Sequence, residues 1–160
     1  MITRMRSRNR ISFFTSVIAA VALALAGCSR LPVYSHFLPV SEQGWARGDS
    51  LHFVVPVDSA GTYRLRLDLR TTSHYPYTQL ALRVSRQSTG SAAQQADTLH
   101  FNITDADGNL QGRGISVFQH SAQLPPVTLQ RGDTLRLSVV HIMSAQQLPG
   151  IADVGITVER

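Results

Sequence analysis

The chain has 160 residues, a formal net charge of +5 at pH 7 and a single cysteine. Four of its 15 arginines lie within the first ten residues, and residues 28–160 carry 11 arginines against 10 acidic residues. This later part lacks the basic excess of nucleic-acid-binding proteins, so we expect no nucleic-acid partner. One cysteine also excludes an intramolecular disulfide framework, and the length of residues 28–160 is typical of one domain.

Residues 1–27 predict a lipoprotein signal peptide. An arginine-rich start precedes an apolar run from Phe13 to Ala26, which is too short for an ordinary membrane span. The sequence Leu25-Ala26-Gly27-Cys28 resembles the lipobox of bacterial lipoproteins, where the signal is cut before a cysteine that carries lipid. We therefore expect Cys28 to be the lipidation site and the protein to be anchored to a membrane. The alternative is a plain secretory signal with an incidental buried cysteine.

Residues 28–50 are expected to form a lipidated N-terminus and a connecting arm, ahead of a folded domain over residues 51–160. The arm contains two prolines and two glycines and shows no sustained hydrophobic period. As free coil it would reach about 25 Å. Trp45 is expected to pack on the domain, because an indole ring is costly to leave in water. The stretch after Cys28 lacks the acidic cluster that marks surface-exported lipoproteins in some bacterial groups, which favours a position facing the periplasm. We expect the anchor to lie in the outer membrane, although the sequence itself leaves inner and outer membrane open.

From Leu51 onward the apolar residues recur with a period of two, which predicts half-buried β-strands separated by turns. About seven or eight short strands at this spacing indicate an antiparallel β-sandwich, either immunoglobulin-like or of jelly-roll type. No segment after the signal has a helical period. The alternating residues are Leu51, Phe53, Val55 and Val57; Tyr63, Leu65, Leu67 and Leu69; Leu80, Leu82 and Val84; Leu99, Phe101 and Ile103; Ile115 and Val117; Leu135, Leu137 and Val139; and Val154, Ile156 and Val158.

The sequence offers no catalytic residues, so we expect a protein that is not an enzyme. Asp105, Asp107 and Asn109 lack the spacing of a calcium loop, and an Asp-Gly turn explains them. The six histidines are scattered, without the spacing that brings two imidazoles to one metal. We therefore expect no metal and no cofactor apart from the covalent lipid.

Two groups of residues are candidate contacts for a partner or ligand. Arg64, Arg66 and Arg70 share the outward face of one predicted strand, where they could meet phosphate groups or an acidic protein. The alternative is a solvated face whose charge Asp68 and acids on neighbouring strands compensate. Tyr75-Pro76-Tyr77 places two rings in a loop stiffened by proline, which suits a contact surface. The alternative is that these rings complete the core at one end of the sandwich.

A series of motifs runs in order along the chain. They are Cys28, Tyr34, Trp45, Asp49, Phe53, Asp58, Tyr63, Arg70, Tyr75-Pro76-Tyr77, Leu80, Asp97-Thr98, Asp105, Gly108, Gly112-Arg113-Gly114, His141, Met143 and residues 148–155. Together these motifs resemble those of the GldH family of gliding-motility-associated lipoproteins of the Bacteroidetes. Gln79 departs from the pattern, since the family has an asparagine there.

The resemblance implies a non-enzymatic envelope lipoprotein that acts in the gliding apparatus and is linked to type IX secretion. Its implied partners are the membrane and other envelope proteins of gliding or secretion. A second hypothesis is a lipid-anchored module that binds glycan or peptidoglycan, with Tyr75 and Tyr77 as the platform for a sugar ring.

Overall fold

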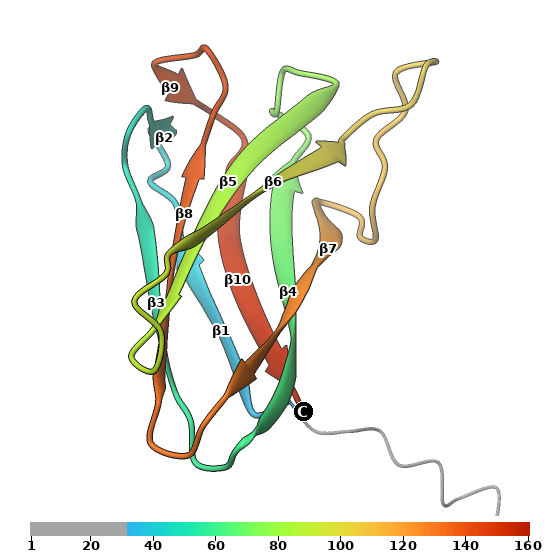
Figure 1. Ribbon diagram of the computed structural model, residues 1–160. Helices are drawn as coiled ribbons and strands as arrows, with labels where there is room; N and C mark the ends of the chain where they lie inside the picture. Colours follow the sequence, from blue (N-terminus) through green and yellow to red (C-terminus); the bar gives the residue numbers. More distant parts are fainter. Residues whose placement is uncertain (1–31) are drawn as a thin grey trace, which may run out of the picture. The chain divides into compact units, whose positions relative to one another are not determined.

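The computed structural model describes residues 32–160, which form ten β-strands and no helix. Two four-stranded antiparallel sheets face each other as a sandwich, and a two-stranded sheet lies at one end (Figure 1). The prediction of an all-β antiparallel sandwich is confirmed, with more strands than expected. The strands are β1 (Tyr34–Pro39), β2 (Trp45–Ala46), β3 (Leu51–Pro56), β4 (Gly61–Thr72), β5 (Gln79–Ser88), β6 (Gln95–Asn102), β7 (Val117–Leu129), β8 (Thr134–His141), β9 (Gln147–Leu148) and β10 (Ile151–Glu159).

The strand order is that of a jelly roll. The first sheet has the order β1-β10-β4-β7 and the second β3-β8-β5-β6, while β2 pairs with β9. In the two large sheets only β5 and β6 are neighbours both in sequence and in space. An immunoglobulin-like sandwich keeps more consecutive strands side by side, whereas this interleaving is typical of the two Greek keys of a jelly roll.

The core lies between the two large sheets and follows from the period of two in the sequence. Alternate side chains of a strand point to opposite faces, so the apolar set of most predicted strands enters the interior. The expected pair Ile115 and Val117 is the exception: β7 begins only at Val117, and the two side chains are 95% and 38% exposed. In β4, Leu65, Leu67 and Leu69 are completely buried. Leu80 and Leu82 of β5 are equally buried in the opposite sheet. Because both layers present large apolar side chains, the domain holds together without a disulfide.

The segment that the sequence assigns to a connecting arm contributes a strand to the first sheet, which corrects that assignment. β1 pairs with β10 along its whole length, from Tyr34 opposite Val158 to Pro39 opposite Asp153. The strand was missed because it lies at an edge and does not alternate cleanly between buried and exposed residues. The compact unit that the structure describes accordingly spans Pro32–Arg160 and includes residues ahead of residue 51.

Trp45 packs on the domain as expected. Its side chain is only 2% exposed, and its indole nitrogen donates to the carbonyl oxygen of Asp49 at 3.0 Å. β2, which carries Trp45, pairs with β9, so the segment between β1 and β3 is held at one end of the sandwich.

The sandwich has an open side between β6 and β7. Each of these strands is the last of its sheet, so neither has a neighbour on that side (Figure 1). β7 contains Pro125 and Pro126, which carry no backbone N–H and are typical of edge strands. This side is therefore protected in part from pairing with another chain.

Candidate functional site

Cys28, the expected lipidation site, lies outside the described residues. The first described backbone contact near it is the Val33 N–H, which donates to the carbonyl oxygen of Val158 at 2.8 Å.

Tyr75 closes the core, so it is not available as a contact residue. The side chain is 5% exposed, and its hydroxyl donates to the Gln79 carbonyl oxygen at 2.9 Å. Its backbone is equally confined, because a Cβ added at Gly150 would lie 2.4 Å from the Tyr75 nitrogen. Burial raises the pKa of Tyr75. For this ring the alternative of core packing is correct.

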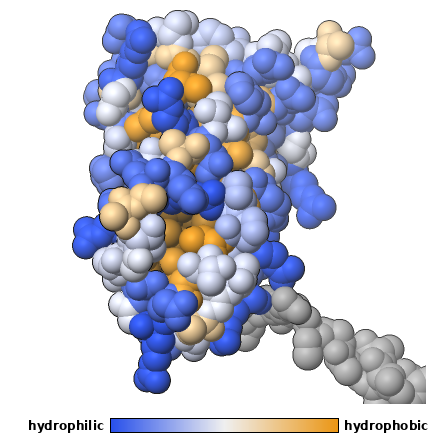
Figure 2. All heavy atoms as spheres, in the orientation of Figure 1, coloured by the Kyte–Doolittle hydropathy of each residue, from blue (hydrophilic) through white to orange (hydrophobic). Residues whose placement is uncertain are grey.

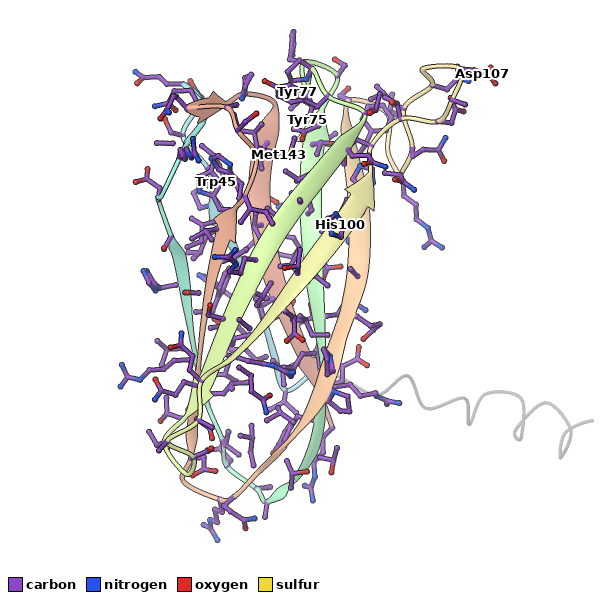
Figure 3. All side chains as sticks on the ribbon, turned by 45° about the horizontal axis from the view of Figure 1, so that its top comes forward. Trp45, Tyr75, Tyr77, His100, Asp107 and Met143 are labelled. Carbon is purple, nitrogen blue, oxygen red and sulfur yellow. The ribbon has the colours of Figure 1, made fainter. Side chains whose placement is uncertain are left out.

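Tyr77 and Pro76 remain candidate contacts. Tyr77 is 41% exposed, and its ring meets the edge of the Tyr75 ring at a centroid distance of 5.8 Å. Both tyrosines lie at the end of the molecule that comes forward in Figure 3. The buried ring therefore supports the exposed one, and a single tyrosine is presented to solvent where the sequence suggested two.

The three arginines of β4 do share a face, but two of them are compensated. Arg66 lies 3.0 Å from Asp68 and 3.7 Å from Glu159. Arg70 lies 2.6 Å from Asp153. Arg64 is exposed and lies opposite Glu159 in the register of β4 and β10. This face is therefore a balanced polar surface, as the alternative hypothesis describes.

A polar cluster on the same face explains why Asp68 is buried. The carboxylate accepts hydrogen bonds from the Ser121 hydroxyl at 2.6 Å, from the Thr157 hydroxyl at 3.0 Å and from Arg66 Nε. Asp68 is 1% exposed, and these donors satisfy its charge. The cluster ties β4 to both of its neighbours, β7 and β10.

Gly155 allows an aromatic ring to lie across the first sheet. Phe37 is directly opposite Gly155 in the register of β1 and β10. A Cβ at Gly155 would lie 2.6 Å from the Phe37 ring, so the ring occupies the space that a side chain would fill. The Arg70 guanidinium lies 4.6 Å from the centre of the same ring, as a cation–π contact.

His141 is buried beside Trp45 at the end of β8. Its Nε2 is 3.2 Å from the Trp45 carbonyl oxygen, and the two rings meet edge to face at 5.5 Å. Burial lowers the pKa of His141, and burial also lowers the pKa of His120 on β7. Both imidazoles therefore favour the neutral form and serve as packing groups with hydrogen bonds.

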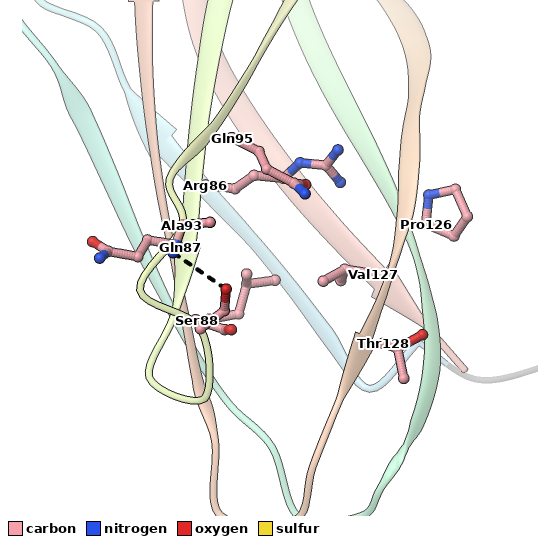
Figure 4. A pocket seen from close by; sticks show the side chains of 10 residues that line it. Arg86, Gln87, Ser88, Ala93, Gln95, Pro126, Val127 and Thr128 are labelled. Carbon is pink, nitrogen blue, oxygen red and sulfur yellow. Dashed lines mark hydrogen bonds between the residues drawn. The ribbon is translucent and has the colours of Figure 1, made fainter.

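Arg86 is a buried arginine that the sequence reasoning missed. It occupies an inward position of β5, in phase with Leu82 and Val84, and is 6% exposed. Its guanidinium lies 3.1 Å from Asp97 Oδ2 on β6 and donates to the Pro125 carbonyl oxygen on β7. Figure 4 shows this side chain at a pocket of about 220 Å³ near the open side of the sandwich. The sequence did contain a signal for it: Arg86 is a charged residue at a position where the alternation of the strand predicts a buried apolar one.

The face drawn in Figure 2 is mostly hydrophilic, and its apolar side chains form small separate areas. Among the described residues, the most exposed of the large apolar side chains is Ile115 at 95%. A partner that docks on this face would meet mainly polar groups.

Residues 32–160 contain no group of three or more histidine, cysteine, aspartate or glutamate side chains placed to hold a metal. Asp105 instead organises a turn, since its Oδ1 accepts from the backbone N–H groups of Asp107 and Asn109. Its hydrogen bonds with Asn109 lower the pKa of Asp105. In the described part of the chain no helix is long and apolar enough to span a membrane.

Two solved structures show a distant likeness to this chain. A family 35 carbohydrate binding module from an environmental isolate shares 19% identity, with a TM-score of 0.41 over 80% of this chain and 79% of that one. The Eiger TNF of S. frugiperda shares 9% identity, with a TM-score of 0.38 over 79% of this chain and 92% of that one.

Sequence comparison confirms the resemblance seen in the motifs. The gliding motility lipoprotein GldH of Flavobacterium johnsoniae is 25% identical over 154 residues, which cover 91% of this chain and 96% of that protein. A GldH homolog of Christiangramia forsetii is 22% identical and covers 94% of this chain and 98% of that protein. The family model described as GldH lipoprotein matches residues 32–158, almost the whole of the described sandwich. The chain belongs to the GldH lipoprotein family.

Proposed function

We propose that this chain is a lipid-anchored, non-enzymatic component of the gliding-motility apparatus that is linked to type IX secretion. The observation that carries the proposal is the extent of the family match, which runs over residues 32–158. The two relatives named for gliding motility are matched over 96% and 98% of their lengths, so the similarity is not confined to a shared signal peptide. We place the protein at the outer membrane, facing the periplasm.

The partners of the buried polar groups are the support for a non-enzymatic role. The buried polar side chains described above have structural partners: Asp68 is satisfied by three donors, and His120 lies 3.2 Å from the Thr71 hydroxyl. Neither group is presented to solvent as a general acid, base or nucleophile would be. In this proposal the sandwich contacts other envelope proteins through exposed loops, including the one that carries Pro76 and Tyr77.

The alternative of a glycan platform made of Tyr75 and Tyr77 is weakened, because the Tyr75 ring is part of the core. A single exposed ring at this end can still contribute to a protein contact.

Deletion of the gene in its own organism tests the proposal. Surface spreading, or secretion of proteins exported by the type IX system, should be lost and should return with the wild-type gene. A Cys28→Ala gene should fail to restore it, because the unlipidated protein leaves the membrane fraction. The proposal is wrong if deletion changes neither spreading nor secretion.

A further inference from the structure

A polar cleft of about 710 Å³ opens between the edge strands β6 and β7. His100 and Asn102 of β6 line one side, and Gln119 and Ser121 of β7 line the other. Figure 3 labels His100 on β6, in the upper half of the sandwich. The volume lies within the range of small-molecule sites. Of the candidate contact residues that the sequence suggested, only Arg66 borders the cleft.

Arg113 is fixed at the rim of this cleft by the backbone of β7. The Arg113 N–H donates to the Gln119 carbonyl oxygen at 3.0 Å, and the Gln119 N–H donates to the Arg113 carbonyl oxygen at 2.9 Å. A Cβ added at Gly112, where φ is +101°, would lie 2.8 Å from the Gln119 oxygen. At Gly114, where φ is +148°, it would lie 1.7 Å from the Val117 oxygen. Glycine on both sides is therefore what allows Arg113 to lie against β7.

The charge at the cleft is positive and concentrated on Arg113. No aspartate or glutamate is among the residues that line the cleft. Arg66, at its border, is already paired with Asp68 and Glu159. Arg113 is exposed, and within residues 32–160 it forms no ion pair. The backbone of Arg113 is fixed and its guanidinium has no counter-charge among the described residues, so it is available to bind an anion. A guanidinium can bind a carboxylate or a phosphate through two parallel hydrogen bonds.

The edge of β7 is closed in part to an added peptide strand. The backbone groups of Gln119 already bond to Arg113, and Pro125 and Pro126 carry no N–H donor. The cleft instead presents amides from Asn102 and Gln119 together with the imidazole of His100. Such groups hydrogen-bond to hydroxyls, and short neutral polar side chains fix the orientation of a small polar ligand.

We propose that the cleft between β6 and β7 binds an acidic sugar of a glycan and that Arg113 binds its carboxylate or phosphate. The site is separate from the Tyr77 loop, and the proposal does not depend on the role in gliding. Binding by the purified protein tests it, whereas spreading and secretion test the proposed function. The two can therefore fail independently.

The test uses the full chain purified in a nonionic detergent, with ¹⁵N-labelled arginine side chains. Trigalacturonate supplies the carboxylate and galactose 6-phosphate supplies the phosphate, while galactotriose is the neutral control. At least one acidic sugar should bind and shift the Arg113 Nε–H resonance, and the neutral sugar should bind more weakly by about tenfold or more. The two acidic probes together distinguish a carboxylate site from a phosphate site.

Two variants and one matched control locate the site. Arg113→Gln should weaken binding of the acidic sugar by about tenfold or more, because the charge-assisted pair is lost. Gly112→Ala keeps the arginine but displaces its backbone from β7, and should also weaken binding. Arg83→Gln removes an exposed arginine of β5 and should leave binding unchanged. Thermal unfolding of each variant, measured without ligand, confirms that it is folded.

Two results overturn the proposal. One is the absence of binding by either acidic sugar, and the other is binding that Arg113→Gln leaves intact. If neither sugar binds but hexaglutamate binds tightly, the cleft is a site for acidic peptides.

Discussion

Tyr75 and Tyr77 are two positions apart but lie in different environments. Their substitutions should therefore lower the free energy of unfolding by different amounts. Tyr75→Ala should lower the free energy of unfolding by about 3 kcal/mol, because a buried ring leaves a cavity. Tyr77→Ala should lower it by about 0.5 kcal/mol, as exposed substitutions usually do. Urea unfolding of the purified protein measures both. Equal losses for the two variants would contradict the assignment of Tyr75 alone to the core.

Tyr75→Phe isolates the hydroxyl from the ring. This variant keeps the packing but removes the donor to the Gln79 carbonyl oxygen, so it should cost about 1 kcal/mol. A loss near that of Tyr75→Ala would mean that the hydrogen bond, and not the ring, stabilises this end of the sandwich.

The two buried histidines should make the domain less stable in mild acid. Burial lowers the pKa of His120 and of His141 in the folded state, whereas in the unfolded chain the pKa of each imidazole is about 6.5. Between the folded and unfolded pKa values the unfolded state binds more protons, so the free energy of unfolding falls as pH drops below about 6.5. Above that pH the contribution is fully present.

Urea unfolding at pH 7.5, 6.0 and 5.0 measures this dependence. The double variant His120→Gln/His141→Gln should lose most of the slope across this range, although it is less stable overall. The matched control is His52→Gln, which removes an exposed imidazole of β3 and should keep the wild-type slope. A wild-type slope in the double variant would mean that other groups titrate.

At the scale of single strands, Arg86 joins three elements at the open side of the sandwich. It extends from β5 to Asp97 on β6 and to the Pro125 carbonyl oxygen on β7, and so connects the two sheets. Arg86→Ala should lower the free energy of unfolding by about 3 kcal/mol, because it leaves buried polar partners unpaired. Arg83→Ala, at an exposed position of the same strand, should cost about 0.5 kcal/mol or less.

A second variant distinguishes the contribution of the Arg86–Asp97 ion pair from the cost of leaving one of its charges unpaired. Arg86→Met/Asp97→Leu removes both charges and fills the space with apolar groups, so it should be more stable than Arg86→Ala. Urea unfolding compares the two. If the double variant is the less stable one, the ion pair itself, rather than the cost of an unpaired charge, stabilises this edge.

How far the sequence predicts an element depends on how that element is buried. β4 was predicted because one of its faces is buried against the core, and its leucines accordingly alternate with polar residues. β1 was not predicted, because its pattern of buried and exposed residues is irregular. Its place beside β10 comes from pairing with residues more than a hundred positions away.

The same reasoning applies to the candidate sites. The sequence placed Arg64, Arg66 and Arg70 on one face, but their neutralisation by Asp153 and Glu159 depends on β10 lying beside β4. The cleft at Arg113 could not be predicted, because it requires β6 and β7 to be the edges of two different sheets. Strand order is a long-range property that a period of two does not encode.

At the scale of the described domain, the two ends of the jelly roll carry different elements and loops. One end holds the start of β1, the C-terminus and the turns at residues 57–60 and 130–133 (Figure 1). Val57 and Asp133 join these turns by a backbone hydrogen bond of 3.0 Å. The opposite end holds the Tyr77 loop and the loop that carries Asp107 (Figure 3).

The position of β1 predicts which end faces the membrane. Cys28 and Val33 are five residues apart, and a chain of this length spans at most about 18 Å. Since Val33 is bonded to Val158 at the start of β1, a lipid on Cys28 would hold that end of the sandwich close to the bilayer. The Asp107 loop would then point away from the membrane.

Energy transfer to an acceptor on lipid headgroups measures this orientation in vesicles that carry the lipidated protein. Arg131→Cys and Asp107→Cys each provide one exposed thiol for a fluorescent donor, provided that the expected acylation blocks the thiol of Cys28. Transfer should be stronger from position 131 than from position 107. Insertion of ten glycine and serine residues after Leu31 should reduce the difference, because a longer flexible tether lets the domain rotate. Equal transfer from both positions with the natural tether would contradict a short anchor at the β1 end.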